Sequence, residues 1–184
     1  MLYTAMVNLH TLAADAAQKA GQILLKYYKN TYEIHDKGYH NPVTTADHEA
    51  DAFLKQFLME ATPEYGWLSE ETVDSPERLD KEFVWIVDPL DGTKEFIEGI
   101  PHFVTSIGLA QNGIPILGVL YNPVTEELIR TDQDGVVWYQ DQKAVLCQET
   151  LLKDVGCLNS RSETRRGLWK PWANEFKELI PIGS

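Results

Sequence analysis

The strongest structural signal in the chain is the stretch Trp85-Ile86-Val87-Asp88-Pro89-Leu90-Asp91-Gly92-Thr93-Lys94-Glu95-Phe96. Its apolar start predicts a buried strand that carries Asp88 to its end. Pro89 stiffens the exit of the strand, and Gly92 permits a tight turn that brings Asp91 back beside Asp88. Two carboxylates at such a distance repel each other unless a cation lies between them, and hard oxygen ligands favour Mg²⁺ or Ca²⁺. The plain alternative is a pair of ordinary turn-forming aspartates.

The residues after this turn predict a phosphate-binding element. Thr93 begins a short helical segment that continues through residues 94–98 and stops at Gly99. The backbone N–H groups of Gly92, Thr93 and Lys94 then point out of a helix N-terminus, where an anion such as phosphate is stabilised.

Two further acidic groups are candidates for the same site. Glu70 and Glu71 follow a predicted strand at residues 67–69, although on their own they would be read as a solvated acidic loop. Thr44 and Asp47 have the spacing of a capping box at the start of a helix. An aspartate at a helix start can also accept a hydrogen bond from a neighbouring hydroxyl, so the capping role and a role in the site are compatible.

Apolar periodicity outside these motifs predicts an α+β fold. Spacings of three and four residues indicate helices over residues 9–27 and 46–58, with a loop or hairpin at 35–45 between them. From residue 67 to 140 the pattern changes to short strands. Two hairpins are expected there, at Asn112-Gly113 between strands 103–110 and 114–121, and at Asp134-Gly135 between strands 127–131 and 136–139. The two helices are therefore expected to pack on one face of a largely antiparallel sheet.

The character of the sequence changes again after residue 144. The expected elements are a strand at 155–158, a helix over 162–179 with a break near Pro171, and a strand that starts at Ile180. We assign residues 1–144 to an N-terminal α+β metal-binding domain. Residues 145–184 are expected to be the beginning of a second α/β domain that is incomplete.

Charge and composition narrow the function classes. The 184 residues include 16 Lys and Arg against 28 Asp and Glu, a formal net charge of −12. Residues 61–100 alone contain eleven acidic and three basic side chains. An acidic surface repels phosphate backbones, which argues against a nucleic-acid partner. Cys147 and Cys157 fit neither a disulfide framework nor a metal site and are expected to be reduced, partly buried thiols. With no signal peptide or membrane-length segment, we expect a cytoplasmic protein without a membrane partner.

Taken together, the motifs resemble the inositol monophosphatase superfamily, a group of lithium-sensitive, magnesium-dependent phosphatases. The resemblance rests on Asp88-Pro-Leu-Asp-Gly-Thr93, on Glu70-Glu71, on Val43-Thr-x-Ala-Asp47 and on Asn159-Ser160-Arg161-Ser162. It implies the N-terminal domain of an α/β/α/β/α layered sandwich, with residues 159–162 opening the second domain. The string DGTKEF is most similar to CysQ-like 3′(2′),5′-bisphosphate nucleotidases, whereas residues 99–103 and 106–108 look closer to inositol monophosphatases proper.

The resemblance also implies roles for individual residues. Metal ligands would be Glu70, Asp88, the carbonyl of Leu90, and Asp91, for two or three Mg²⁺ ions. Catalytic residues would be Asp47 and Thr93, which orient and deprotonate the attacking water. Substrate-binding residues would be Glu70, Leu90, Asp91, Gly92 and Thr93. Lys37, in the loop before Thr44, could approach the metals, although a solvated loop lysine is the more ordinary reading.

The implied reaction is hydrolysis of a small phosphorylated metabolite, with inhibition by Li⁺ and a possible homodimer. Adenosine 3′,5′-bisphosphate, converted to AMP and phosphate, is the first substrate expected. Inositol-1-phosphate and histidinol phosphate are alternatives. The family's second domain normally adds a metal-binding aspartate in a Trp-Asp-x-Ala-[AG]-Gly string, which this sequence lacks. We therefore expect a fragment or truncated form of the fold, and a metal- and phosphate-binding module without catalysis remains an alternative of another class.

Overall fold

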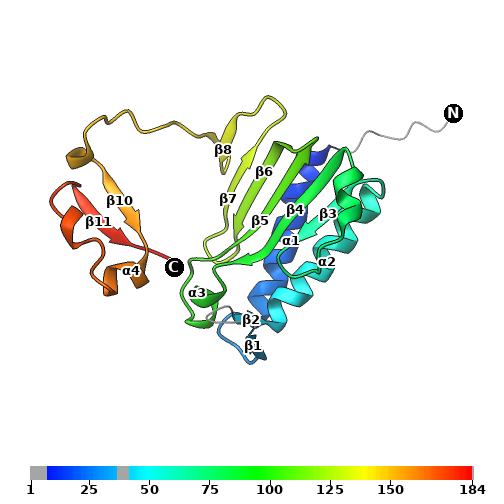
Figure 1. Ribbon diagram of the computed structural model, residues 1–184, viewed down its shortest axis with the longest axis horizontal. Helices are drawn as coiled ribbons and strands as arrows, with labels where there is room; N and C mark the ends of the chain where they lie inside the picture. The colour runs from blue at the N-terminus through cyan, green and yellow to red at the C-terminus, as the bar shows by residue number, and fades with distance from the viewer. Residues whose placement is uncertain (1–7, 37–41, 184) are drawn as a thin grey trace.

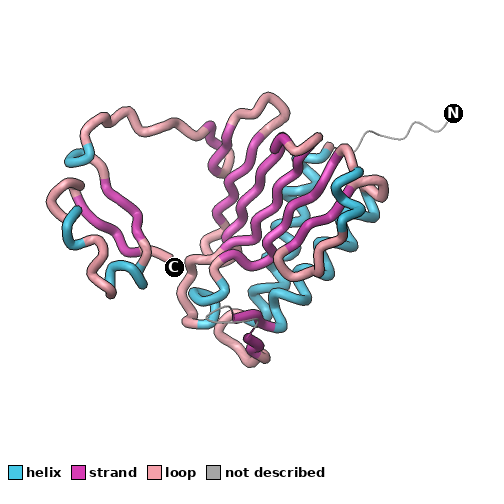
Figure 2. The backbone as a smooth tube through the Cα atoms, viewed as in Figure 1, coloured by secondary structure: helices cyan, strands magenta, loops and turns pink. Residues whose placement is uncertain are grey.

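The computed structural model describes residues 8–36 and 42–183, and its largest part is a seven-stranded sheet with two long helices along one face (Figure 1). Figure 2 shows the strands of this sheet side by side, with the two long helices along one side of them. The α+β fold class and the two-helix layer predicted from the sequence are both confirmed.

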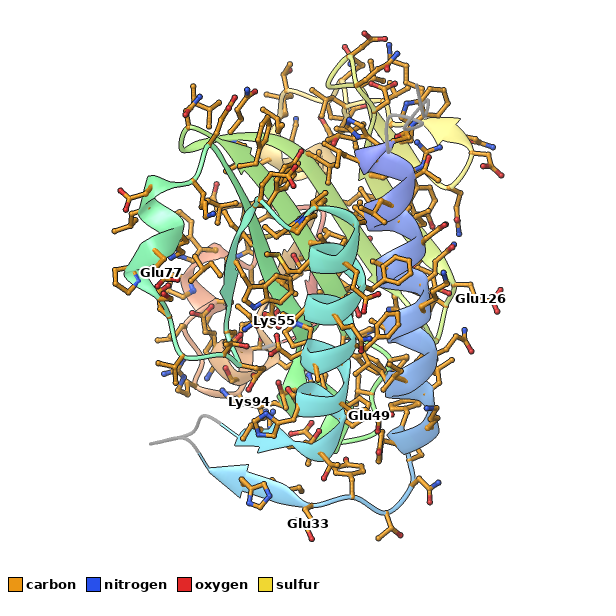
Figure 3. All side chains as sticks on the ribbon, turned by 90° about the vertical axis from the view of Figure 1, so that its right-hand side faces the viewer. Glu33, Glu49, Lys55, Glu77, Lys94 and Glu126 are labelled. Atoms are coloured by element: carbon orange, nitrogen blue, oxygen red, sulfur yellow. The ribbon has the colours of Figure 1, made fainter. Side chains whose placement is uncertain are left out.

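The two long helices coincide with the two amphipathic segments. They are α1 (Leu9–Tyr27) and α2 (Thr45–Ala61). Each begins at a side-chain cap, because Asn8 accepts from two backbone N–H groups of α1 and Thr44 forms a capping box with Asp47 at the start of α2. Figure 3 shows the helices lying next to each other across the sheet. The capping box was predicted from the spacing of Thr44 and Asp47, and this prediction is confirmed.

The main sheet has the strand order β3-β4-β5-β6-β7-β8-β9. Its strands are β3 (Gly66–Ser69), β4 (Phe83–Asp91), β5 (Val104–Gln111), β6 (Ile114–Asn122), β7 (Glu127–Thr131), β8 (Val137–Tyr139) and β9 (Gln142–Lys143). All neighbouring pairs are antiparallel except β3 and β4, which run parallel. Both predicted hairpins are present. At the first, Asn112 and Gly113 have φ values of 49° and 80°, which a two-residue hairpin turn requires.

The core lies between the helices and one face of the sheet. Alternation along β4 decides which side chains enter it: Trp85 is fully buried, whereas its neighbour Ile86 is 45% exposed on the opposite face. Helix α1 approaches this sheet closely because Gly21 has no side chain, and a Cβ there would lie 2.7 Å from the ring of Tyr121. The other face of the sheet carries half-exposed apolar residues, among them Ile86 and Leu120.

A small hairpin precedes α2. Strands β1 (Ile34–Asp36) and β2 (Pro42–Thr44) pair antiparallel, in agreement with the loop or hairpin expected at residues 35–45. Lys37, considered above as a residue that could approach the metals, lies outside the described residues. None of the helices in the described part of the chain is both long and apolar enough to cross a membrane.

The region after residue 144 forms a separate two-stranded sheet. Its elements are β10 (Gly156–Asn159), α4 (Arg161–Arg165) and β11 (Glu178–Pro181), with 3₁₀ turns at Leu152–Asp154 and Lys170–Trp172. The strands are parallel, as expected for a β-α-β-like unit. Figure 1 shows this unit joined to β9 by an extended connection.

Two expectations for this region are wrong. The helix expected over residues 162–179 ends at Arg165, because Gly167 adopts a left-handed φ of 78° and Pro171 restarts the chain as a 3₁₀ turn. Both cysteines are free thiols, and Cys157 is partly buried as expected. Cys147 is exposed instead, because it lies in the extended connection and contacts no core.

Candidate active site

The end of strand β4 forms the turn that the sequence predicted. The pairing of β4 with β5 is regular up to Asp88 and resumes only at Asp91, so Pro89 and Leu90 bulge out of the sheet. The N–H of Leu90 donates to Oδ1 of Asp88 at 3.1 Å, which closes the bulge on itself. The bulge turns the chain so that Asp88 and Asp91 lie near each other.

Gly92 follows this bulge in a conformation that a side chain would prevent. Its φ is +99°, and a Cβ there would lie 2.7 Å from the carbonyl oxygen of His102. The residue is the N-cap of the short helix α3 (Thr93–Ile97), which was also predicted from the sequence. Glycine is therefore required both for the backbone angle and for the close approach of the next segment.

Thr93 connects the bulge with helix α2. Its Oγ1 lies 3.2 Å from Oδ1 of Asp47 and 3.1 Å from the carbonyl oxygen of Leu90. The other oxygen of Asp47, Oδ2, accepts from the backbone N–H and the hydroxyl of Thr44 at 2.8 and 2.6 Å. Asp47 is 1% exposed, and this burial raises the pKa of its carboxyl in spite of the hydrogen bonds that it accepts. One carboxylate thus caps α2 and holds the Thr93 hydroxyl.

Three carboxylates surround the end of β4. Burial raises the pKa of Asp88 to about 8, and the negative charges of Glu70 and Asp91 act in the same direction. Burial also raises the pKa of Asp91, with further contributions from Glu70 and Glu95. Glu70 reaches this position because it directly follows β3, where its N–H donates to the carbonyl of Val87 at 3.2 Å. The group therefore concentrates negative charge that a cation would relieve.

These donors suit a hard divalent cation. Carboxylate oxygens and the Leu90 carbonyl are the ligand types that Mg²⁺ takes in proteins, usually with waters completing its shell. Within residues 8–36 and 42–183, no three His, Cys, Asp or Glu side chains converge into a closed group of metal ligands. Glu70, Asp88, Asp91 and the Leu90 carbonyl offer oxygen ligands only, which suits Mg²⁺ better than Zn²⁺.

Asp51 is a further residue of the site, and sequence reasoning missed it. It lies one helical turn after Asp47 on the buried face of α2 and is 7% exposed. Its carboxylate accepts hydrogen bonds from the hydroxyl of Ser69 and, at 2.6 Å, from that of Thr72. Asp51 thus holds both sides of the loop that contains Glu70. The available signal was an aspartate on the apolar face of an amphipathic helix, where an unpaired charge would be unfavourable.

A cavity of about 460 Å³ adjoins this turn. Its lining consists of Asp91, Gly92, Glu95, Pro101, His102, Phe103, Val104, Asn122, Thr125, Glu127, Ile182 and Gly183. The cavity has the size of a small-molecule site and lies between the main sheet and the end of β11. Its lining includes three carboxylates and neither lysine nor arginine among the described residues.

The structure brings together the predicted site residues in two neighbouring sets. In one set, hydrogen bonds connect Thr93 to Asp47 and to Leu90. The other set is Glu70, Asp88 and Asp91, three carboxylates close enough for their negative charges to raise the pKa of Asp88. A model described as the inositol monophosphatase family matches residues 6–175. The chain belongs to the inositol monophosphatase family. The resemblance seen in the sequence motifs is therefore confirmed.

Relatives of known name agree with this assignment. The inositol-1-monophosphatase of Mesorhizobium japonicum is 35% identical over 161 residues, which cover 85% of this chain and 59% of that protein. The solved structure of the extragenic suppressor protein SuhB from Bartonella henselae has a TM-score of 0.83 and 27% identity, covering 96% of this chain and 70% of the other. For an IMPase of Thermotoga maritima the TM-score is 0.85 at 22% identity, covering 95% and 68%, which shows a shared fold. The chain spans little more than half the length of its curated relative.

Proposed function

We propose that this chain is the metal-binding part of a magnesium-dependent phosphomonoesterase that acts on a small phosphorylated metabolite. The observation that carries the proposal is the hydrogen bond between Thr93 Oγ1 and Asp47 Oδ1. It places a buried proton acceptor and a hydroxyl directly beside the bulge of Asp88, Leu90 and Asp91. Family membership supports the same reaction class.

The proposed ligands of Mg²⁺ are Glu70, Asp88, Asp91 and the carbonyl of Leu90. Bound there, Mg²⁺ would act as a Lewis acid, lowering the pKa of water and neutralising charge on the phosphoryl oxygens. Mg²⁺ held by these residues would balance their negative charge, which would allow an acidic protein to bind an anionic substrate.

Asp47 and Thr93 are proposed to move the proton of the attacking water. Thr93 Oγ1 can pass its own proton to Oδ1 of Asp47 while it accepts one from the water. Burial raises the pKa of Asp47, which makes its carboxylate a better proton acceptor than an exposed aspartate. Thr44 holds the other oxygen of Asp47 and so keeps Oδ1 directed at Thr93.

The backbone after the bulge is proposed to bind the phosphate group. The first hydrogen bond of this turn runs from the N–H of Phe96 to the carbonyl of Gly92, so the N–H groups of Gly92 and Thr93 are not used within α3. Glu70, Leu90 and Asp91 would contact the substrate from the adjoining bulge.

For the substrate, the cavity favours a polyol monophosphate such as inositol-1-phosphate over adenosine 3′,5′-bisphosphate. A second phosphate would have to enter a space in which Glu127 is a carboxylate without a cationic partner, and no lysine or arginine is found among the described lining residues. The hydroxyl groups of a polyol can instead donate to Glu127. The names of curated relatives support the same choice. The string DGTKEF remains the argument for the nucleotidase, and histidinol phosphate, whose amine is cationic, is a further candidate.

The test is phosphate release by the chain from these three substrates, with Mg²⁺ and with chelator. We expect release that requires Mg²⁺, that is highest with inositol-1-phosphate and that falls when Li⁺ is added. Asp88→Asn should abolish release, whereas Glu77→Gln, at an exposed position in a 3₁₀ turn, should leave it unchanged. Calorimetric binding of Mg²⁺ and phosphate without any release would instead support the non-catalytic module. Release that does not depend on Mg²⁺ would contradict the proposal.

A further inference from the structure

Arg161 connects the C-terminal region with the candidate site. It is the first residue of α4, directly after the cap Ser160. Its Nη2 donates to Oε1 of Glu95 at 3.0 Å and to Oε2 of Glu98 at 2.8 Å, and both glutamates belong to the segment of α3 and its C-cap. Among the described residues, the ion pairs between residues 145–183 and the preceding part of the chain are these two.

The buried carboxylate of Glu95 has Arg161 as its hydrogen-bond donor and counter-charge. The side chain of Glu95 is 1% exposed, and within the described part of the chain its carboxylate accepts a hydrogen bond from Arg161 alone. The second carboxylate oxygen, Oε2, and Nε of Arg161 are also buried and find no partner there. A buried carboxylate that loses its cation is strongly unfavourable. Removal of Arg161 would therefore drive Glu95, and the helix to which it belongs, toward another position.

Helix α3 transmits such a movement to the bulge. Glu95 follows Asp91 by four residues, and the intervening turn is closed by the hydrogen bond of 3.0 Å from the N–H of Phe96 to the carbonyl of Gly92. Gly92 itself is packed against the segment of His102, which leaves it little room to absorb a shift. The positions of Asp91 and Thr93 are thus coupled to the ion pairs of Arg161.

We propose that Arg161 is a positioning residue, which fixes α3 through Glu95 and Glu98 and thereby couples the C-terminal region to the cation site at Asp91. The inference rests on the proposed function only in its consequence for Mg²⁺. Coupling is reciprocal, so Mg²⁺ bound at Asp91 would also hold the C-terminal region against the main sheet.

The variant Arg161→Gln separates a simple effect of charge from a positioning role, because the two predict opposite changes in Mg²⁺ affinity. Arg161→Gln removes a positive charge near the site, which by itself would strengthen Mg²⁺ binding. Positioning predicts that binding becomes about tenfold weaker, the usual scale for residues that orient metal ligands. Arg166→Gln is the matched control, because it makes the same charge change at an exposed position next to α4. Both variants and the wild-type chain would be titrated with Mg²⁺ by calorimetry.

We expect Arg161→Gln to bind Mg²⁺ about tenfold more weakly than Arg166→Gln, and Arg161→Lys, which keeps the charge, to lie between Arg161→Gln and the wild type. Glu95→Gln should also weaken binding, and the double variant should be no weaker than Arg161→Gln, because both changes break one interaction. Binding by Arg161→Gln that equals or exceeds that of Arg166→Gln would overturn the inference. If Arg161→Gln does not fold, Arg161→Lys decides in its place: it keeps the charge, so weaker Mg²⁺ binding than in the wild type supports positioning, and unchanged binding overturns it.

Hydrogen exchange separates this inference from the proposed function. We expect faster amide exchange across residues 93–98 in Arg161→Gln than in Arg166→Gln, with or without Mg²⁺. A wild-type chain that binds no Mg²⁺ would contradict the proposed function, and the exchange result would still decide the coupling. Unchanged exchange in this segment would overturn the inference.

Discussion

Residues 8–144 and residues 145–183 are stabilised in different ways. In the first region, large side chains such as Trp85, Phe96 and Phe103 are fully buried between the helices and the sheet. In the second, comparable side chains such as Leu168 and Trp172 are each 54% exposed, and β10 and β11 form a sheet of only two strands. A two-stranded sheet has little stability of its own. The first region is therefore stabilised by its core, whereas the second has no comparable core, and its ion pairs to the first region, among the described residues, are those of Arg161.

The difference also separates the parts of the site. Every candidate metal ligand and both residues proposed to move the proton, Asp47 and Thr93, lie in the well-packed region, at the ends of strands and helices. The second region contributes Ile182 and Gly183 to the cavity. We infer that the proposed chemistry is built on the well-packed region and that the second region helps to enclose the substrate.

Replacing one tryptophan in each region is the strongest test of this contrast. Trp85→Ala should lower the free energy of unfolding by about 3–5 kcal/mol, because it leaves a large cavity and removes the hydrogen bond of 2.9 Å from the indole to Thr62. Trp172→Ala should change it by no more than about 0.5 kcal/mol. Urea unfolding followed by circular dichroism measures both. Equal effects would show that the second region shares the core.

A second test addresses the turn of the site within the well-packed region. Gly92→Ala should lower the free energy of unfolding by about 2–3 kcal/mol, because the left-handed φ is strained for alanine and its Cβ would meet the His102 carbonyl. Gly135→Ala is the control, since Gly135 also has a positive φ but nothing lies within 4 Å of its Cβ position. There the cost should be about 1 kcal/mol. Thermal melts of both variants would suffice, and similar melting temperatures would contradict the close packing at Gly92.

Asp51 provides a third test, aimed at the loop that contains Glu70. Asp51→Asn should lower the free energy of unfolding by about 1–2 kcal/mol. The hydroxyls of Ser69 and Thr72 each donate to one carboxylate oxygen, and in asparagine one of these oxygens is replaced by an NH₂ group, which cannot accept. Mg²⁺ binding should weaken as well, by about tenfold. Asp15→Asn, at an exposed position of α1, should change neither quantity. Full Mg²⁺ affinity in Asp51→Asn would remove Asp51 from the site.

The last test concerns the pH dependence of the metal-free chain. The pKa of Asp88 is raised to about 8 in the folded state, above its value of 3.8 in an unfolded chain, so the folded state binds the proton more tightly. The stability that this proton provides is present at low pH and is lost as the pH rises toward 8. In chelator, the melting temperature should therefore decrease from pH 6 to pH 8. Both Asp88→Asn and saturating Mg²⁺ should make the melting temperature less dependent on pH. A melting temperature of the wild-type chain that does not change between pH 6 and pH 8 would contradict the raised pKa of Asp88 beside Glu70 and Asp91.

Sequence predicted the fold where local signals are strong. Apolar periodicity gave both long helices, and Asn112-Gly113 and Asp134-Gly135 located the hairpins because such pairs permit the required positive φ values. The parallel pairing of β3 with β4 was not predicted, since the connection over residues 70–82 has no turn motif that defines a strand direction. The helix expected over 162–179 does not form, and the apolar residues that predicted it, such as Leu168 and Trp172, are exposed and have no core to pack against.

The candidate site was predicted as far as it lies in contiguous motifs. The bulge after Asp88 and the capping box of Asp47 follow from neighbouring residues. Asp51 and Arg161 were not identified as site residues, because their partners are 18 to 66 positions away in the sequence. Such contacts are set by how the elements pack, and no single segment of sequence contains them.

The two oxygens of Asp47 have a consequence for any substitution at this position. Residues in active sites commonly sacrifice stability for function, so that replacing them makes a protein more stable but inactive. Here Oδ2 completes the cap of α2, while Oδ1 holds the hydroxyl of Thr93. A substitution that removes both acceptors would damage the helix start and the proposed proton path together. The folding of α2 and the chemistry proposed for the site are therefore linked through one side chain.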